Sequence, residues 1–292
     1  MKVLITGAEG QLGVDLVDAF RAHQVHPTTY EELDVTRADQ VQETLRAFGP
    51  DVVVNATAWT DVDGCELDEK QAHETNALGP WWLARACADV DAELVTISTD
   101  YVFDGSLPLD WQGQPRPRTE FDPVDPLNAY GRAKAAGEAL VRQALDRHYI
   151  VRTAWLSGAR GNNFIRTMLR LAREHEPVTV VDDQFGSPTF TRDLADAIVE
   201  LAGSGLYGTW NRTNSGTCSW FDLAEASFDL AGLSVDLRRQ SSTALARRAP
   251  RPAWSVLSSQ HATLAGLTPL RPWREGLERL LDELGDLDTD AP

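Results

Sequence analysis

Two side chains near the middle of the chain, Tyr130 and Lys134, have the types and spacing of a proton-transfer pair. They stand four residues apart, so on a helix both project from the same face. A tyrosine with an ordinary pKa of about 10 is a poor acid–base catalyst at neutral pH, and a nearby ammonium group lowers that pKa. We therefore predict that Lys134 lowers the pKa of Tyr130, and that Tyr130 protonates a carbonyl oxygen as hydride reaches its carbon.

Lysine is scarce in this chain, and that favours a chemical role for Lys134. The 27 cationic residues include only three lysines, at positions 2, 70 and 134, and the rest are arginines. A Tyr–Lys pair on a solvated helix face is the competing interpretation. Against that interpretation, the chain has a lysine at position 134 although it uses arginine at most other cationic positions. A lysine supplies a compact charge whose pKa can be tuned.

A polar stretch, Ser98-Thr99-Asp100-Tyr101, follows the apolar run 94–98. Ligands of parallel sheets bind at the carboxyl ends of the strands, so this stretch is expected beside the substrate. There Thr99 can hydrogen-bond the same substrate oxygen as Tyr130. The alternative is that Thr99 only caps the end of its strand.

Three glycines, Gly7, Gly10 and Gly13, lie between a predicted strand at residues 2–6 and a predicted helix at 11–22. In a dinucleotide site the first glycine makes the turn, the second lets backbone approach the pyrophosphate, and the third allows helix and strand to pack closely. The pattern alone is weak, because any tight strand–helix turn can contain it. Its place directly after the first strand favours a dinucleotide.

The segment 25–32 is expected to meet the adenosine ribose of that dinucleotide. It offers Glu31 and Glu32, and no arginine occurs between Arg21 and Arg37. A free 2′-hydroxyl prefers an acid and a 2′-phosphate prefers arginine, so NADPH and NADH both stay open and these residues favour NADH. Asp34 and Val35 suit the adenine. The two glutamates can equally form a solvated acidic turn.

The elements that must position these residues alternate between strand and helix, which predicts an α/β fold of the Rossmann type with a doubly wound parallel sheet. We predict a dinucleotide-binding domain over 1–155 that is rejoined by segments near 178–212. A smaller, interleaved substrate-binding domain takes 156–177 and 213–285. The ranges concerned are strands at 2–6, 51–56, 94–98, 149–153 and 178–182, and helices at 11–22, 69–88, 129–144, 164–174, 192–202, 220–231 and 273–284.

Composition excludes several classes of protein. The formal net charge of −17 argues against nucleic acids and anionic membranes as partners. No apolar run is long enough to span a membrane, and the first glycine comes too early for a signal peptide, so a cytoplasmic location is expected. The three cysteines are far apart, which predicts neither a disulfide framework nor a metal site.

Longer stretches carry a resemblance to the extended short-chain dehydrogenase/reductase superfamily, and within it to the dTDP-4-dehydrorhamnose reductase family. The resemblance runs from residue 1 to about residue 275. The stretches are GAEGQLG at 7–13, NATAWTDVD at 55–63, STDYVFDG at 98–105, PLNAYGRAKAAGE at 126–138, RTAW at 152–155, GNNF at 161–164 and DQFGSPT at 183–189.

The resemblance implies a role for each matching residue. Tyr130 would be the proton donor, Lys134 its partner, and Thr99 would tune the proton transfer. The dinucleotide would contact Gly7, Gly10, Gln11, Leu12, Gly13, Asp34, Val35, Ala58, Trp59, Thr60 and Ile97, together with Tyr130 and Lys134. The nucleotide-sugar would contact Thr99, Asp100, Tyr101 and Trp155, with Asn163 and Gln184 as further candidates.

The reaction implied is reduction of the C4 ketone of dTDP-4-dehydro-L-rhamnose by NADPH or NADH. Trp59 and Ser157 depart from residues frequent in the family, which leaves the identity of the sugar open. Three alternatives stay open: another sugar-nucleotide 4-ketoreductase, an epimerase or dehydratase, and a non-enzymatic dinucleotide-binding regulatory subunit. A dehydratase is disfavoured because Tyr101 stands where an acid would expel water. Dimers are common in the superfamily, so a homodimer is implied while the sequence leaves the oligomeric state open.

Overall fold

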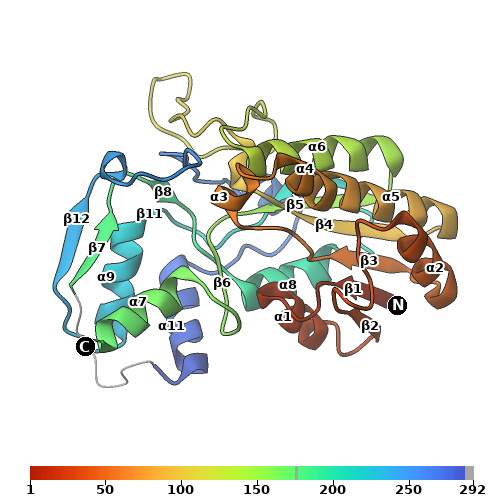
Figure 1. The fold of residues 1–292 in the computed structure, drawn as a ribbon, viewed down its shortest axis with the longest axis horizontal. Coiled ribbons are helices and arrows are strands. Elements are labelled where there is room, and N and C mark those ends of the chain that lie inside the picture. The colour runs from red at the N-terminus through yellow and green to blue at the C-terminus, as the bar shows by residue number, and fades with distance from the viewer. Residues whose placement is uncertain (175–176, 287–292) are drawn as a thin grey trace.

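A six-stranded parallel sheet forms the centre of the computed structural model, which describes residues 1–174 and 177–286 (Figure 1). Its strands follow the order β10-β5-β4-β3-β1-β2. The α/β fold with a doubly wound parallel sheet is therefore confirmed. The strands are β1 (Lys2–Thr6), β2 (Gln24–Thr28), β3 (Val52–Asn55), β4 (Glu93–Thr99), β5 (His148–Thr153) and β10 (Gly208–Asn211).

Helices cover both faces of the sheet because successive strand residues point to opposite sides. Val3 and Ile5 of β1 pack against one face, whereas Leu4 between them packs against the other. One layer is made by α1 (Gln11–Ala19) and α8 (Thr191–Leu201). The other is made by α2 (Ala38–Phe48), α5 (Gly79–Val90) and α6 (Ala129–Ala144).

The single helix predicted over 69–88 is three helical segments. They are α4 (Glu69–His73), the π-helical turn η1 (Glu74–Leu78) and α5. Such π turns often occur at functional sites. Here the wide turn contains the buried Asn76, whose side chain accepts from Trp59 N at 3.0 Å and donates to Trp59 O at 2.9 Å. The turn therefore fixes the loop that follows β3.

A smaller group of elements lies at the other end of the molecule (Figure 1). Its apolar cores join α7 (Phe164–Arg173), α9 (Trp220–Leu230) and α11 (Trp273–Leu284), with β7 (Val178–Val181) paired to β12 (Leu237–Gln240). The short elements are α3 (Val62–Cys65), η2 (Asp100–Val102), β6 (Leu156–Ser157), β8 (Phe185–Gly186), β9 (Thr189–Phe190), β11 (Cys218–Ser219), η3 (Ser242–Ala244) and α10 (Gln260–Leu264).

The interleaving of the two groups differs in one place from the prediction. The segment expected to rejoin the large sheet begins near residue 178, but β7 pairs with β12 outside that sheet because its apolar side chains pack on α9. The segments that reach the sheet are α8 and β10. Residues 175 and 176 of the predicted segment 156–177 lie outside the described residues.

Candidate active site

A cleft of about 410 Å³ opens at the carboxyl ends of β1, β3, β4 and β5. In this sheet the strand order reverses between β1 and β3, which is where ligands bind in doubly wound folds. The cleft is lined by Gly10, Gln11, Leu12, Ala56, Ala58, Thr60, Val62, Ile97, Ser98, Thr99, Asp100, Tyr101, Tyr130, Lys134, Thr153, Ala154, Trp155, Leu156 and Trp220.

The glycine turn leaves no room for side chains at its two ends. Gly7 has a φ of +67°, a conformation that L side chains rarely adopt. A methyl group at Gly13 would lie 2.1 Å from the carbonyl oxygen of Gly7. Helix α1 begins directly after Gly10, which gives it no side-chain cap, so the first backbone N–H groups of the helix are left for an anion.

Lys134 is anchored to the end of β4. Its Nζ donates to the carbonyl oxygen of Ile97 at 2.6 Å, and only 4% of the residue is exposed. Burial lowers the pKa of Lys134 to about 8, and the carboxylate of Glu138 opposes that fall. Helix α6 thus brings Lys134 and Tyr130 into the same cleft, as their spacing predicts.

The predicted direction of the Tyr130 pKa shift is wrong. Burial raises the pKa of Tyr130, the carboxylate of Asp100 adds to the rise, and the Thr99 side chain opposes it. Lys134 does not produce the expected fall, because its ammonium group is directed to Ile97 O. At neutral pH the phenol is therefore protonated, and it holds the proton that a donor must give.

Thr99 and Asp100 form a buried polar pair beside Tyr130. The hydroxyl of Thr99 donates to Oδ1 of Asp100 at 2.8 Å and accepts from Tyr101 N at 3.1 Å. Among the described residues, Oδ2 of Asp100 has no hydrogen-bond partner. Burial raises the pKa of Asp100 to about 6. Thr99, the last residue of β4, caps the start of the short helix η2, and it also lines the cleft.

Two aromatic side chains, Trp155 and Trp220, line one wall of the cleft. The rings of Trp155 and Trp220 are stacked with their centroids 3.6 Å apart and their planes 9° from parallel. Trp155 has a φ of +49°, which costs about 1–3 kcal/mol in a residue other than glycine. A methyl group at Gly186 would lie 2.4 Å from the Trp155 indole. The surroundings therefore hold Trp155 in one orientation.

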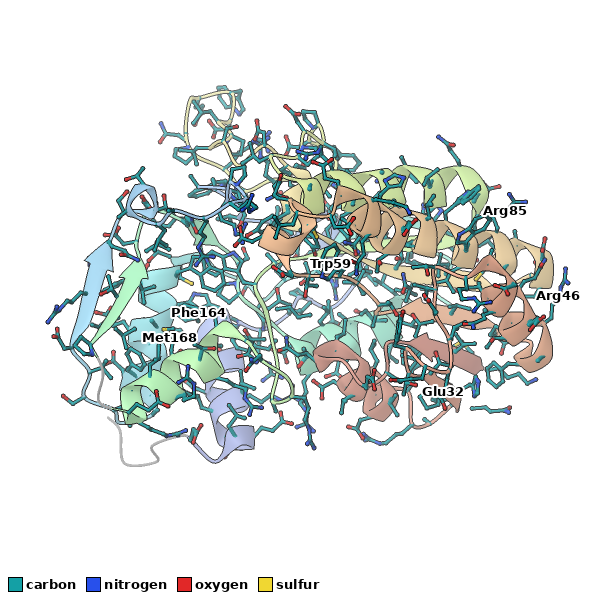
Figure 2. The ribbon with its side chains drawn as sticks, viewed as in Figure 1. Glu32, Arg46, Trp59, Arg85, Phe164 and Met168 are labelled. Carbon is teal, nitrogen blue, oxygen red and sulfur yellow. The ribbon has the colours of Figure 1, made fainter. Side chains whose placement is uncertain are left out.

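A second cavity of about 450 Å³ adjoins the cleft and shares Tyr101 and Trp220 with it. Phe164 and Met168 of α7 border it, and Figure 2 labels both in the smaller group of elements. Arg251 and the exposed Arg247 also line it. Gln184, predicted on the substrate side, lies here and not in the first cleft.

Several predicted cofactor residues lie outside the cleft lining. Gly7 and Gly13 form the turn beneath it. Asp34 accepts from the backbone and hydroxyl of Thr36, at 2.9 and 2.7 Å, and Val35 is buried against Gly79. Trp59 is half-buried near the middle of the molecule, where its backbone is held by Asn76 (Figure 2).

Asn163 serves a structural purpose in this arrangement. Its Oδ1 caps α7 by accepting from Arg166 N at 3.0 Å, and its Nδ2 donates to Oε1 of Gln11 at 3.0 Å. Asn163 does not line the cleft. Instead, Gln11 and Asn163 tie the glycine turn to the smaller group of elements.

Three residues near the site were not found by sequence reasoning. Trp220 lines both cavities, Asn76 fixes Trp59, and Glu138 lies one helical turn beyond Lys134. Trp220 and Asn76 act across long stretches of chain, so no local pattern marks them. Glu138 had a signal, since it stands four residues after Lys134 on the same helix face.

Residues 1–174 and 177–286 contain neither a metal-binding cluster nor a membrane-spanning helix. No group of three or more His, Cys, Asp or Glu side chains there is arranged to hold a metal ion. No helix in these ranges has the length and apolar character needed to cross a membrane.

Comparison with known proteins places the chain among sugar-nucleotide reductases. A family model described as the RmlD substrate binding domain matches residues 1–285. The dTDP-4-dehydrorhamnose reductase of Mycolicibacterium smegmatis is 43% identical and covers 100% of this chain and 88% of its own. The dTDP-4-keto-6-deoxy-D-glucose reductase of Streptomyces niveus is 42% identical, with 94% of each chain covered.

A solved structure gives the same answer. The dTDP-4-dehydrorhamnose reductase of Bacillus anthracis, solved in complex with NADP, is 39% identical and superposes with a TM-score of 0.92 over 97% of this chain and 99% of its own. These findings confirm the resemblance drawn from the sequence motifs. The chain belongs to the dTDP-4-dehydrorhamnose reductase family, a family of NAD(P)H-dependent oxidoreductases.

Proposed function

We propose that this protein reduces the C4 ketone of dTDP-4-dehydro-L-rhamnose to dTDP-L-rhamnose, with NADPH or NADH as hydride donor and Tyr130 as proton donor. The observation that carries the proposal is one cleft that a protonated Tyr130 lines together with the glycine turn, Thr99, Lys134 and Trp155. The names of the relatives support the substrate.

The residues present fit a dinucleotide. The uncapped start of α1 offers the N–H groups of Gln11 and Leu12 to a pyrophosphate. Ala58 and Thr60 line the adjoining wall, and Lys134 is the cation available to the nicotinamide ribose. When it is bound there, the dinucleotide supplies the hydride.

Tyr130 and its neighbours perform the proton transfer. Because the Tyr130 phenol is neutral, it can donate to the ketone oxygen as negative charge develops there. Thr99 presents its hydroxyl to the same oxygen, and Trp155 supports the sugar. General acid catalysis of this kind contributes about 10²–10⁴-fold, and holding the reactants in register adds a further term.

The test follows NADH and NADPH absorbance with purified protein and dTDP-4-dehydro-L-rhamnose. We expect oxidation that falls about 10²–10⁴-fold in kcat for Tyr130→Phe, with cofactor affinity retained. Lys134→Ala should lower both kcat and cofactor affinity. Wild-type ketone reduction by Tyr130→Phe would overturn the assignment of the donor. No oxidation with either cofactor would overturn the proposed reaction.

We further propose a preference for NADH. Glu32 accepts from Thr29 N at 2.9 Å just after β2, the strand whose end meets the adenosine ribose in this fold (Figure 2). The nearest arginines in sequence are already paired, Arg21 with Asp18 and Arg37 with Asp39. This favours an unphosphorylated 2′-hydroxyl over a phosphate, and comparing kcat/KM for the two cofactors checks it.

The second cavity is the proposed place for the nucleotide end of the substrate. It adjoins the cleft at Trp220, an aromatic surface on which a base can stack, and Arg247 and Arg251 are cations for a diphosphate. Gln184 would contact the base from the same cavity. Arg247→Ala should raise KM for the sugar nucleotide and leave cofactor affinity unchanged.

A second candidate substrate is a related dTDP-4-keto-6-deoxy sugar. The Streptomyces niveus relative, named for dTDP-4-keto-6-deoxy-D-glucose, is nearly as similar as the Mycolicibacterium smegmatis one. Comparing kcat/KM for the two ketones decides between them. In this proposal residues 1–155 hold the dinucleotide and the smaller part holds the sugar nucleotide, while a homodimer and a cytoplasmic location stay predictions.

A further inference from the structure

Helix α6 carries a row of four functional groups that extends beyond the catalytic pair. Tyr130, Lys134, Glu138 and Arg142 follow one another at intervals of four residues, so they share one helix face. The first two line the cleft. Glu138 comes next, with 3% of the residue exposed. A buried carboxylate needs partners, and those partners connect it to the site.

Glu138 is fully engaged in hydrogen bonds. Its Oε1 accepts from Ser98 Oγ at 2.6 Å and from Arg152 Nε at 2.8 Å. Its Oε2 accepts from Nη2 of Arg152 at 2.6 Å and Nη2 of Arg142 at 2.7 Å. The Glu138–Arg152 contact is a two-point ion pair with both side chains 2% exposed. This pairing keeps the pKa of Glu138 low despite its burial.

The end of β4 joins this carboxylate to the catalytic residues. Three successive residues each make one connection: Ile97 O accepts from Lys134, Ser98 donates to Glu138, and Thr99 donates to Asp100. Ser98 itself lines the cleft. The strand end and the helix are therefore held together at Lys134 and again at Glu138.

We propose that Glu138 is a positioning residue for the reaction, whose buried carboxylate is the counter-charge that keeps Lys134 an ammonium group at the end of β4. This rests on the proposed function, in which that ammonium group holds the nicotinamide ribose. The charge is needed because burial favours a neutral amine, and a neutral amine would hold the ribose less well. Within the described residues, Glu138 is the anion that opposes this effect at Lys134.

Other titratable groups face the pair from several elements. Tyr130 lies on the same helix as Lys134, Asp100 follows β4, and Arg152 projects from β5. Arg152 is cationic, so alone it would favour a neutral Lys134, and its pairing with Glu138 removes much of that influence. Loss of Glu138 therefore removes an attraction and also leaves the guanidinium of Arg152 without its ion-pair partner.

The first experiment measures the charge of Lys134 directly. Because the chain has three lysines, a sample labelled with ¹³C at the lysine ε-carbon gives three NMR signals, and Lys2→Arg and Lys70→Arg assign the two exposed residues. We expect Glu138→Gln to move the Lys134 titration to lower pH while Lys2 and Lys70 stay unchanged. An unchanged Lys134 titration in a folded variant would overturn the proposal.

The second experiment is the pH profile of ketone reduction. Glu138 raises the pKa of Lys134, so its removal lowers that pKa and the alkaline loss of activity begins at lower pH. Each unit of fall changes the ratio of charged to neutral lysine about tenfold at a fixed pH. KM for the cofactor should rise at pH 8 and recover toward wild type at pH 6.5. A loss of activity equal at all pH values would mean that Glu138 only stabilises the core.

Three further variants separate the effect of the Glu138 charge from other effects of the substitution. Glu138→Asp retains the charge, so Lys134 should titrate at nearly the same pH as in the wild type. Arg142→Gln removes the partly exposed partner and leaves the carboxylate, so it should not lower the pKa of Lys134. If Glu138→Gln fails to fold, Glu138→Gln with Arg152→Met removes both buried charges and should still lower it. A shifted Lys134 titration without ketone reduction would refute the proposed function and leave the role of Glu138 intact.

Discussion

One wall of the cleft is formed mainly by backbone and the other by aromatic side chains. At the glycine turn the wall is mainly backbone: Gly7 and Gly13 are shaped by a turn that leaves no space for side chains. The other wall is aromatic, and Trp155 and Trp220 meet there from points 65 residues apart in the chain. The first wall suits the pyrophosphate that all dinucleotides share. The second presents side chains that can differ with the substrate.

The largest effect should follow from disturbing the backbone wall. A methyl group at Gly13 would lie 2.1 Å from Gly7 O and 2.7 Å from the Cα of Ala8, so in Gly13→Ala the turn must move. We expect cofactor affinity to fall about 10- to 100-fold, since overpacking a dense region typically costs about 1–3 kcal/mol. Fluorescence titration with NADH measures it. Gly10→Ala is the milder comparison, with its methyl 3.2 Å from Gly7 O.

Substitutions in the aromatic wall should leave the affinity for the cofactor unchanged. Trp220→Leu removes the ring stacked on Trp155, and we expect KM for the sugar nucleotide to rise about tenfold, the size of one aromatic contact. Trp111→Leu is the matched control, because that indole is 89% exposed and lines neither cavity. Equal changes in cofactor affinity and substrate KM would contradict the division between the walls.

Asp100, between the two walls, should make stability depend on pH. Its folded pKa is about 6, above the unfolded value of about 3.9, so the folded form binds more protons between these values and loses stability as pH rises through that window. Asp100→Asn should therefore raise Tm relative to wild type more at pH 7.5 than at pH 4.5. Thermal melts at the two pH values give the Tm difference between variant and wild type at each pH. Any effect of the substitution on Tm that does not depend on pH cancels when the two differences are compared.

The smallest effect is expected at Glu32, which follows β2 and does not line the cleft. Glu32→Gln removes the exposed carboxylate after β2 and should reduce the preference for NADH over NADPH by a few-fold. The ratio of kcat/KM for the two cofactors gives the answer. Glu31→Gln, an exposed neighbour, shows what loss of charge alone does.

The backbone wall could be predicted from the sequence, whereas only Trp155 of the aromatic wall could, through the family resemblance, and Trp220 could not. Gly7, Gly10 and Gly13 are close in sequence and directly follow an apolar strand, so one short pattern predicts the turn and its position. The same holds for Tyr130 and Lys134, which share a helix face. Trp220 reaches Trp155 only after the chain has returned to the sheet through α8 and β10, and no spacing records that contact.

A local pattern also misjudged one electrostatic detail. The spacing of Tyr130 and Lys134 indicated a lowered pKa for Tyr130, but burial and Asp100 raise it, since both effects come from residues that the pattern does not contain. Asn163 matches a family stretch, and its side chain caps α7 and holds Gln11. Its contact with the nucleotide-sugar stays a prediction.

The interleaved path of the chain also has a mechanical consequence. The backbone passes between the large sheet and the smaller group after β5, again before α8, and again after β10. Several chain crossings between two parts restrict their rotation about a single hinge. We therefore expect the two walls to move by small sliding displacements. For the same reason neither part is an independent folding unit. Heating should therefore unfold both parts in a single cooperative transition.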